Sequence, residues 1–283
     1  MALNRRGIGA SLGLAPFFAY VTIFLIIPTI VVIVNAFVNS EGAFTMDAVN
    51  SLKSEANLTA TKNTIVLSLE TAIFGAVVGA LVAYVVSTGK PNGTLRKFVT
   101  SASGVLAQFG GVALAFAFIA TVGRQGVVSG WLQDINIDIT NSTWLFSLTG
   151  LKLVYAYFQI PLMVIVFIPA LDGIRPQWRE AAENLGASTW QYWRHVGVPL
   201  LLPAFLGSAL LLFANSFAAY ATARALISQG APIMALRIGQ AIGNENVNVG
   251  NEAAAIAFEM VIIVAIVMFL YSRLEKRTSG WLR

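Results

Sequence analysis

The sequence predicts an all-α integral membrane protein with six transmembrane helices. Hydrophobic residues make up 57% of the 283 residues and charged residues only 11%, whereas an ordinary soluble domain carries roughly 25% charged residues. The apolar residues also cluster in runs of about twenty, which is the number of helical residues needed to cross a bilayer core. Because the whole chain has this character, we expect a single membrane domain over residues 1–283.

Six spans follow from these runs, with approximate ends. The N-terminal run continues to Val38, well past the apolar stretch of a secretory signal. We therefore interpret it as a retained first span, with kinks or breaks at Pro16 and Pro28. The predicted spans are residues 14–38, 64–86, 99–122, 146–170, 202–226 and 253–272.

The basic residues between the spans predict an orientation. With a cytoplasmic N-terminus, the inside segments hold Arg5, Arg6, Lys90, Arg96, Lys97, Arg175, Arg179, Arg194, Arg273, Lys276, Arg277 and Arg283, whereas the outside segments hold Lys53, Lys62, Arg124 and Arg237. This bias predicts that both termini lie in the cytoplasm. It also explains the net charge of +5, so we expect membrane lipid as a partner and no nucleic acid.

Small residues recur on one side of the second span. Gly75 and Gly79 form a G-x-x-x-G arrangement, with Ala72, Ala76 and Ala83 at related spacings. Small side chains let helix backbones approach closely in a lipid environment. The pattern therefore predicts a face on which the second span packs against another helix.

The cytoplasmic segment from residue 172 to 201 predicts two short helices. Pro176 suits the first turn of a helix, and Gly186 suits a left-handed stop after it. Ser188 followed by Gln191 fits the capping box of a second helix.

The first of these helices is predicted to carry an apolar ridge. Trp178, Ala182 and Leu185 would share one of its faces. A loop that only links two spans needs no such ridge, whereas a helix that docks into a groove of another protein does. The pattern therefore indicates a docking surface.

In the same segment, Glu180-Ala181-Ala182 is followed after three residues by Gly186-Ala187, and later by Val198-Pro199. This pattern resembles the EAA motif of binding-protein-dependent ABC importer permeases, in which leucine usually precedes the proline. The segment precedes the penultimate span, and six spans with cytoplasmic ends extend the resemblance over nearly the whole chain. The resemblance implies a multi-pass protein of the bacterial cytoplasmic (inner) membrane.

The resemblance implies that this segment is a coupling helix held in a cleft of a separate ATPase subunit. Its partners would be an ABC ATPase dimer, a second permease subunit and an extracytoplasmic solute-binding protein. The permease pair could be identical or mixed, and the polyamine-type resemblance given below favours a different chain. By position in the motif, the resemblance implies that the residues that couple to the ATPase are Glu180, Ala181, Ala182, Leu185, Gly186 and Ala187.

No catalytic site is predicted in this chain. It lacks the G-x-x-x-x-G-K-[ST] phosphate loop, so ATP and Mg²⁺ are expected on the partner ATPase and no cofactor here. An intramembrane metalloenzyme is disfavoured because His195 is the only histidine and cysteine is absent, so no metal ligands are assigned. We expect a transport subunit rather than an enzyme.

Charged and polar side chains within the spans are candidates for a solute pathway. A charge at the bilayer centre costs at least about 2.5–3.5 kcal/mol, so such side chains normally pair or face a polar cavity. For the charges in the outer half of the spans (Glu70, Lys152, Arg224 and Glu259), pairing between helices is favoured over a place on the pathway. The pathway candidates are Glu70, Gln159, Asn215, Tyr220 and Glu259.

The sequence says less about the solute. Residues 212–223 resemble permeases grouped with spermidine/putrescine importers, which favours a small polar solute of the polyamine type. The same group also includes relatives assigned to iron, phosphonate and thiamine. The alternative function is an ion-driven secondary transporter, which would also carry intramembrane charges but would not need the coupling motif.

Overall fold

The computed structural model describes residues 14–39, 41–90, 92–135, 144–227, 231–243 and 247–278. These residues are mainly helical, and their only β-pairing is an isolated bridge between Val38 and Phe44. Six helices among them are long and apolar enough to cross a membrane, namely Leu14–Asn35, Glu55–Ser87, Gly111–Asp134, Leu148–Asp172, Thr189–Ala218 and Asn251–Lys276. The predicted all-α class with six spans is therefore confirmed.

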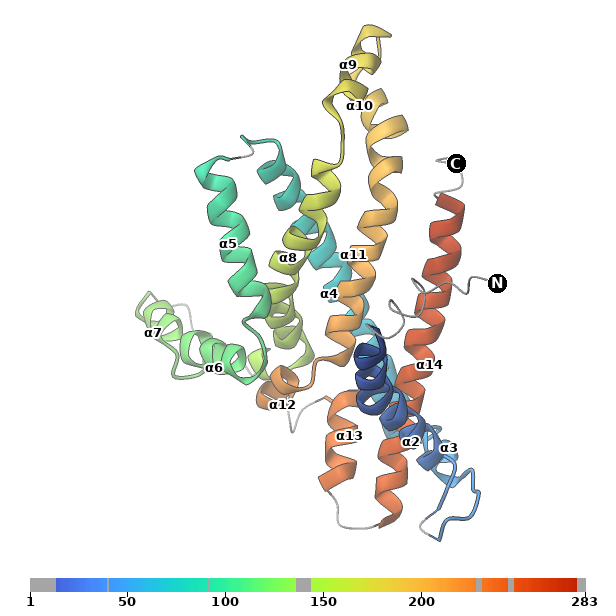
Figure 1. The fold of residues 1–283 in the computed structure, drawn as a ribbon. Helices are drawn as coiled ribbons and strands as arrows, with labels where there is room; N and C mark the ends of the chain where they lie inside the picture. The colour runs from blue at the N-terminus through green and yellow to red at the C-terminus, as the bar shows by residue number, and fades with distance from the viewer. Residues whose placement is uncertain are drawn as a thin grey trace, which may run out of the picture. The chain divides into compact units, whose positions relative to one another are not determined.

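Figure 1 shows the elements in chain order. Two of them are π-helical turns, η1 and η3, and η2 is a 3₁₀ turn. The elements are η1 (Thr22–Ile26), α2 (Ile27–Asn35), α3 (Asp47–Ser51), α4 (Glu55–Ser87), α5 (Thr94–Gln108), α6 (Gly111–Val122), α7 (Val127–Asp134), η2 (Trp144–Phe146), α8 (Leu148–Asp172), α9 (Pro176–Asn184), α10 (Thr189–Tyr192), η3 (Trp193–Gly197), α11 (Val198–Ala218), α12 (Ala221–Ile227), α13 (Met234–Gly243) and α14 (Val247–Thr278).

The chain forms two compact units. The first comprises Met1–Leu58 with Arg237–Ile262, and the second comprises Thr59–Leu236 with Ile263–Arg283. The single membrane domain over residues 1–283 stays a prediction.

In the first unit, the N-terminal span is one helical run with an irregular turn. The π turn η1 comes just before Pro28, which stands in the first turn of α2, and the run then continues to Asn35. The irregularity predicted at Pro28 is thus a local widening, which suits a residue that has no backbone N–H to donate. No residue of η1 or α2 is buried.

A polar network ties the first unit together. The Arg237 guanidinium donates to Asn57 Oδ1 at 3.0 Å and to Glu252 Oε1 at 2.9 Å, and the Asn57 amide also donates to Glu252 Oε1 at 3.0 Å. Nearby, the Phe37 and Phe258 rings meet edge to face, with their centroids 5.2 Å apart.

In the second unit, α4 and α8 cross at the predicted small-residue face. A Cβ added at Gly75 would lie 2.8 Å from Gln159 Cβ, and one at Gly79 would lie 2.5 Å from Met163 Cβ. Real Cβ atoms do not approach so closely, so only glycine permits this spacing. The predicted packing face of the second span is therefore confirmed.

The helices α5 and α11 also pack along α8, and Arg96 of α5 forms an ion pair with Asp172 at the end of α8. The core of this unit lies around α8 and contains the buried side chains of Leu67, Leu114, Leu151, Tyr155 and Leu226.

Two predicted spans are broken, which corrects the expectation of continuous helices. In the range 99–122, α5 ends at Gln108 and α6 starts at Gly111, where φ is +68°. In the range 202–226, α11 ends at Ala218 and α12 starts at Ala221. The helices α4 and α14 also extend beyond the predicted 64–86 and 253–272 at both ends.

Hydroxyl groups from other helices satisfy the backbone at both breaks. Tyr155 of α8 donates to the carbonyl of Ala219 at 2.8 Å, and Thr222 of α12 donates to the carbonyl of Gly111 at 3.1 Å. Non-helical backbone at membrane depth needs such partners, because lipid offers none. The two breaks are thus joined to each other through α12.

Candidate coupling segment and solute pathway

The helix α9 lies beyond the adjoining ends of α8 and α11 in the second unit (Figure 1). Pro176 occupies its first turn, and Gly186 follows its C-terminus with φ +77°. The Gly186 N–H donates to the Glu183 carbonyl and the Ala187 N–H to the Ala182 carbonyl, each at 2.9 Å. The predicted left-handed stop is therefore present, and it satisfies carbonyls at the helix end.

The second short helix, α10, begins with the predicted capping box. The Gln191 N–H donates to Ser188 Oγ at 3.3 Å, while the Ser188 N–H donates to Gln191 Oε1 at 2.7 Å. These reciprocal bonds fix the direction in which the chain leaves Gly186 and returns towards α11.

The helix α9 has no buried residue along its whole length. Both Glu180 and Ala181 are exposed. Along the predicted apolar ridge, Leu185 is 87% exposed and Trp178 is 37% exposed. An exposed leucine and tryptophan at this spacing provide the apolar surface that a docking helix needs.

Charges on α9 are arranged along the helix itself. Arg179 Nε donates to Glu183 Oε1 at 2.8 Å, one helical turn further on. This hydrogen bond, with the negative charge of Glu183, raises the pKa of the Arg179 guanidinium. Arg179 is therefore paired within its own helix and not with the neighbouring Glu180.

Trp193 contacts Tyr84 of α4 and so links this segment to that helix. No role was predicted for it from the sequence. The Trp193 ring meets the Tyr84 ring edge to face at 5.4 Å between centroids. It also covers Gly197, where an added Cβ would lie 2.5 Å from the ring. Trp193 thus contacts α4 at Tyr84 and packs on Gly197, the last residue of η3, directly before α11. The signal available in the sequence was a tryptophan four residues before a glycine.

Among the pathway candidates, Glu70 forms an ion pair with Lys152 between α4 and α8. Their side chains are 51% and 35% exposed, respectively. Both line a pocket of about 420 Å³, together with Thr71, Phe74 and Thr149 among others. The prediction of interhelical pairing is confirmed for these two residues, and the pair remains accessible from the pocket.

Gln159 has a different environment. Its side chain is fully buried, and its amide donates to Thr71 Oγ1 at 2.9 Å. Thr71 Oγ1 lies 3.0 Å from Ser216 Oγ of α11. Gln159 thus helps to join three helices in this conformation, and its place on the pathway stays a prediction.

The remaining candidates are not among the residues that line this pocket. Asn215 is exposed on α11, and Tyr220 is exposed in the break between α11 and α12. Glu259 belongs to the part of α14 in the first unit, and Arg224 of α12 is exposed. Roles for these residues in solute passage also stay predictions.

A family model described as "binding-protein-dependent transport system inner membrane component" matches residues 75–280. The chain belongs to this family. The match includes α5 to α12 and therefore the whole coupling segment. Together with the six apolar helices, it identifies a multi-pass inner-membrane component of a transport system.

Curated relatives are similar over part of their length. The sulfate transport permease CysT of Escherichia coli is 31% identical over 157 residues, which is 55% of this chain and 53% of CysT. The molybdenum transport permease ModB of Escherichia coli is 29% identical over 117 residues, 41% of this chain and 49% of ModB. The chain thus spans about half the length of these relatives.

Solved structures share the fold. A bacterial ABC transporter involved in alginate import contains a chain with a TM-score of 0.75 and 22% identity, with 96% of each chain covered. The methionine ABC transporter MetNI in an inward-facing conformation contains a chain with a TM-score of 0.59 and 18% identity, covering 78% of this chain and 95% of that one. At these identities the likeness concerns the fold alone.

Proposed function

We propose that this permease forms part of the solute pathway of an ATP-driven importer and receives its driving force through α9. The observation that carries this proposal is the form of the coupling segment. A short helix with no buried residue is followed directly by exposed Leu185, the Gly186 turn closes its C-terminus, and the Ser188 capping box begins the next helix. Such a helix is held rigidly enough to transmit force and is exposed enough to dock.

The proposed partners are an ABC ATPase dimer, a second permease of a different chain and an extracytoplasmic solute-binding protein. ATP and Mg²⁺ would bind the ATPase subunits, and both termini of this chain would lie in the cytoplasm. When the ATPases close, they would move α9, and the contacts of Trp193 with Tyr84 and Gly197 would carry that movement into α4 and α11.

The pathway is proposed to run past the pocket that contains Glu70 and Lys152. This pocket offers one carboxylate, one ammonium group and the hydroxyls of Thr71 and Thr149. Groups of both signs suit a small polar solute without selecting a cation or an anion. The polyamine type stays a prediction, because similar permeases are named for the transport of sulfate, thiamine and molybdenum.

The proposal is tested by purifying the tagged chain from native membranes in a mild detergent and identifying the proteins that accompany it by mass spectrometry. An ATPase and a solute-binding protein in stoichiometric amounts are expected, and the ligand of the binding protein would name the solute. A chain that is isolated alone under several mild conditions, and whose uptake follows an ion gradient, would overturn the proposal in favour of a secondary transporter.

A further inference from the structure

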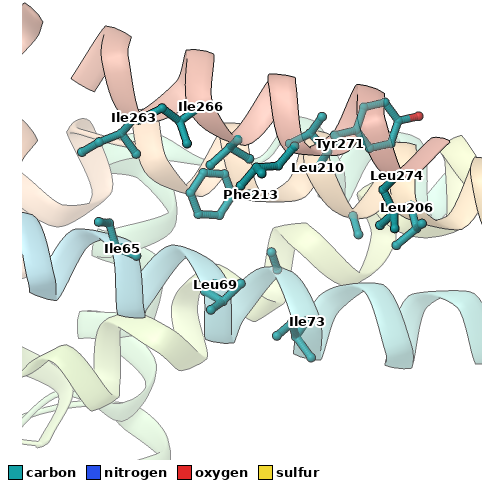
Figure 2. A pocket seen from close by; sticks show the side chains of 14 residues that line it. Ile65, Leu69, Ile73, Leu206, Leu210, Phe213, Ile263, Ile266, Tyr271 and Leu274 are labelled. Carbon is teal, nitrogen blue, oxygen red and sulfur yellow. The ribbon is translucent and has the colours of Figure 1, made fainter. Parts of the chain in front are cut away.

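A long apolar groove runs along the second unit between α4, α11 and α14, and Figure 2 shows its lining. Its volume is about 680 Å³. Isoleucine, leucine and phenylalanine side chains from all three helices point into it, with Ile65, Leu210 and Ile266 as representatives of each helix. The lining residues have no charged side chain, and Tyr271 contributes the one polar group.

We propose that this groove binds one acyl chain of an anionic phospholipid from the leaflet on the side of α9. On α14 the groove extends from Ile263 to Leu274, which is about 16 Å at 1.5 Å per residue. The hydrocarbon core of a bilayer is about 30 Å thick, so one leaflet supplies about 15 Å. The groove therefore has the length of one acyl chain within one leaflet.

The end of the groove is suited to a lipid head group. Tyr271 lies there, and its hydroxyl is close to α11, since a Cβ added at Gly207 would be 2.9 Å from it. Tyrosine is enriched at the level of the head groups because its ring is apolar and its hydroxyl polar. This places the head group at the level of Tyr271 and of the residues that follow it on α14.

Basic residues occupy that last part of α14. Arg273 is exposed and lies over the Phe269 ring at 4.7 Å from its centroid, and Lys276 is also exposed. Glu275 is the one acidic residue in this turn. The net positive charge at the end of the groove favours an anionic head group over a zwitterionic one.

The character of the lining favours a lipid over a transmembrane helix of another chain. Helices in membranes approach each other closely through small residues, as α4 and α8 do here at Gly75 and Gly79. The groove is lined mostly by large branched side chains, with only Ala72 and Ala209 as small ones. Such a surface admits a thin, flexible occupant more readily than a second helix.

The test uses the whole transporter in vesicles that contain phosphatidylglycerol with a photoreactive group near the middle of one acyl chain. After illumination, labelled peptides are mapped by mass spectrometry. We expect labelling to concentrate on the groove face of α14 and α11. Uniform labelling of all exposed apolar faces, or cross-links from this groove to another polypeptide, would overturn the proposal.

Two leucines that are adjacent on α11 provide matched variants. Leu210 lines the groove, whereas Leu211 is exposed outside it. Leu210→Trp should abolish the concentrated labelling and the retention of one lipid per chain in native mass spectrometry, and Leu211→Trp should leave both unchanged. Equal behaviour of the two variants would contradict the proposal.

A charge variant tests the head group in a chain whose groove is intact. Arg273→Gln should weaken the preference for phosphatidylglycerol over phosphatidylcholine about fivefold, the factor that corresponds to about 1 kcal/mol per basic residue near an anionic surface. An unchanged preference would remove the anionic head group from the proposal, even if Leu210→Trp does not yield folded protein.

Discussion

The left-handed turn at Gly186 allows a test in which only backbone conformation is changed. A Cβ added at this residue would meet nothing within 4 Å, so a larger side chain has room. The φ of +77° is the obstacle, because a residue other than glycine pays roughly 1–2 kcal/mol for left-handed backbone. For the β-branched Gly186→Val the cost lies at the upper end or above. A loss of this size lowers the ratio of the native turn to other conformations of the segment about 5- to 30-fold.

The assay measures ATP hydrolysis and solute uptake on the same proteoliposomes that contain the complete transporter. Gly186→Val should reduce the solute imported per ATP at least about fivefold while the protein is still inserted and assembled. Gly186→Asn is the matched control, because asparagine tolerates left-handed backbone and should retain coupling. Normal coupling in the valine variant, or equal damage in both variants, would refute the assignment of the turn to coupling.

Three further predictions concern the second unit. Glu70→Gln and Lys152→Met should each destabilise the protein, and a double-mutant cycle in thermal unfolding should show a coupling of about 0.5–3 kcal/mol; strict additivity would contradict the ion pair. Gly79→Val should lower stability by about 1–3 kcal/mol or more because its side chain would overlap α8, whereas Gly104→Val, at a glycine with open space around it, should cost less in the same denaturation assay. Tyr155→Phe should cost about 1–3 kcal/mol in thermal unfolding, since it leaves a backbone carbonyl in the break of the fifth span without its donor, and an unchanged Tm would rule out that role.

The coupling segment could be predicted closely because its structure is determined locally. Pro176, Gly186 and the pair of Ser188 and Gln191 each act within four residues of their own position. The close approach of α4 and α8 was likewise visible in Gly75, since a small residue on a membrane helix has a direct packing consequence.

The two helix breaks could not be predicted in the same way. The apolar run continues through Ala219, and no proline marks the end of α11 there. The break is stabilised by the hydroxyl of Tyr155, which comes from another helix and is 64 residues away in the sequence. The break after α5 had a local signal in Gly110 and Gly111, but a glycine pair within a span fits close packing equally well.

The residues that line the solute pathway could not be predicted from the sequence of one chain. Glu70 was predicted either to pair or to line the pathway, and the structure shows it paired with Lys152 while also lining a pocket. Asn215 is exposed on α11, and the sequence of one chain does not tell which of its exposed polar residues the proposed second permease would face.

The central claim, that α9 docks on an ATPase, is tested most directly by site-specific cross-linking. The chain contains no cysteine, so Leu185→Cys places a single thiol on α9 without further changes, and Trp131→Cys provides an exposed control site on α7. With a short thiol-reactive photo-cross-linker in native membranes, Leu185→Cys should cross-link to an ATPase subunit with a yield that changes when ATP is added, and Trp131→Cys should not. Cross-linking of Leu185→Cys to lipid alone, or to no ATPase with or without ATP, would contradict the account.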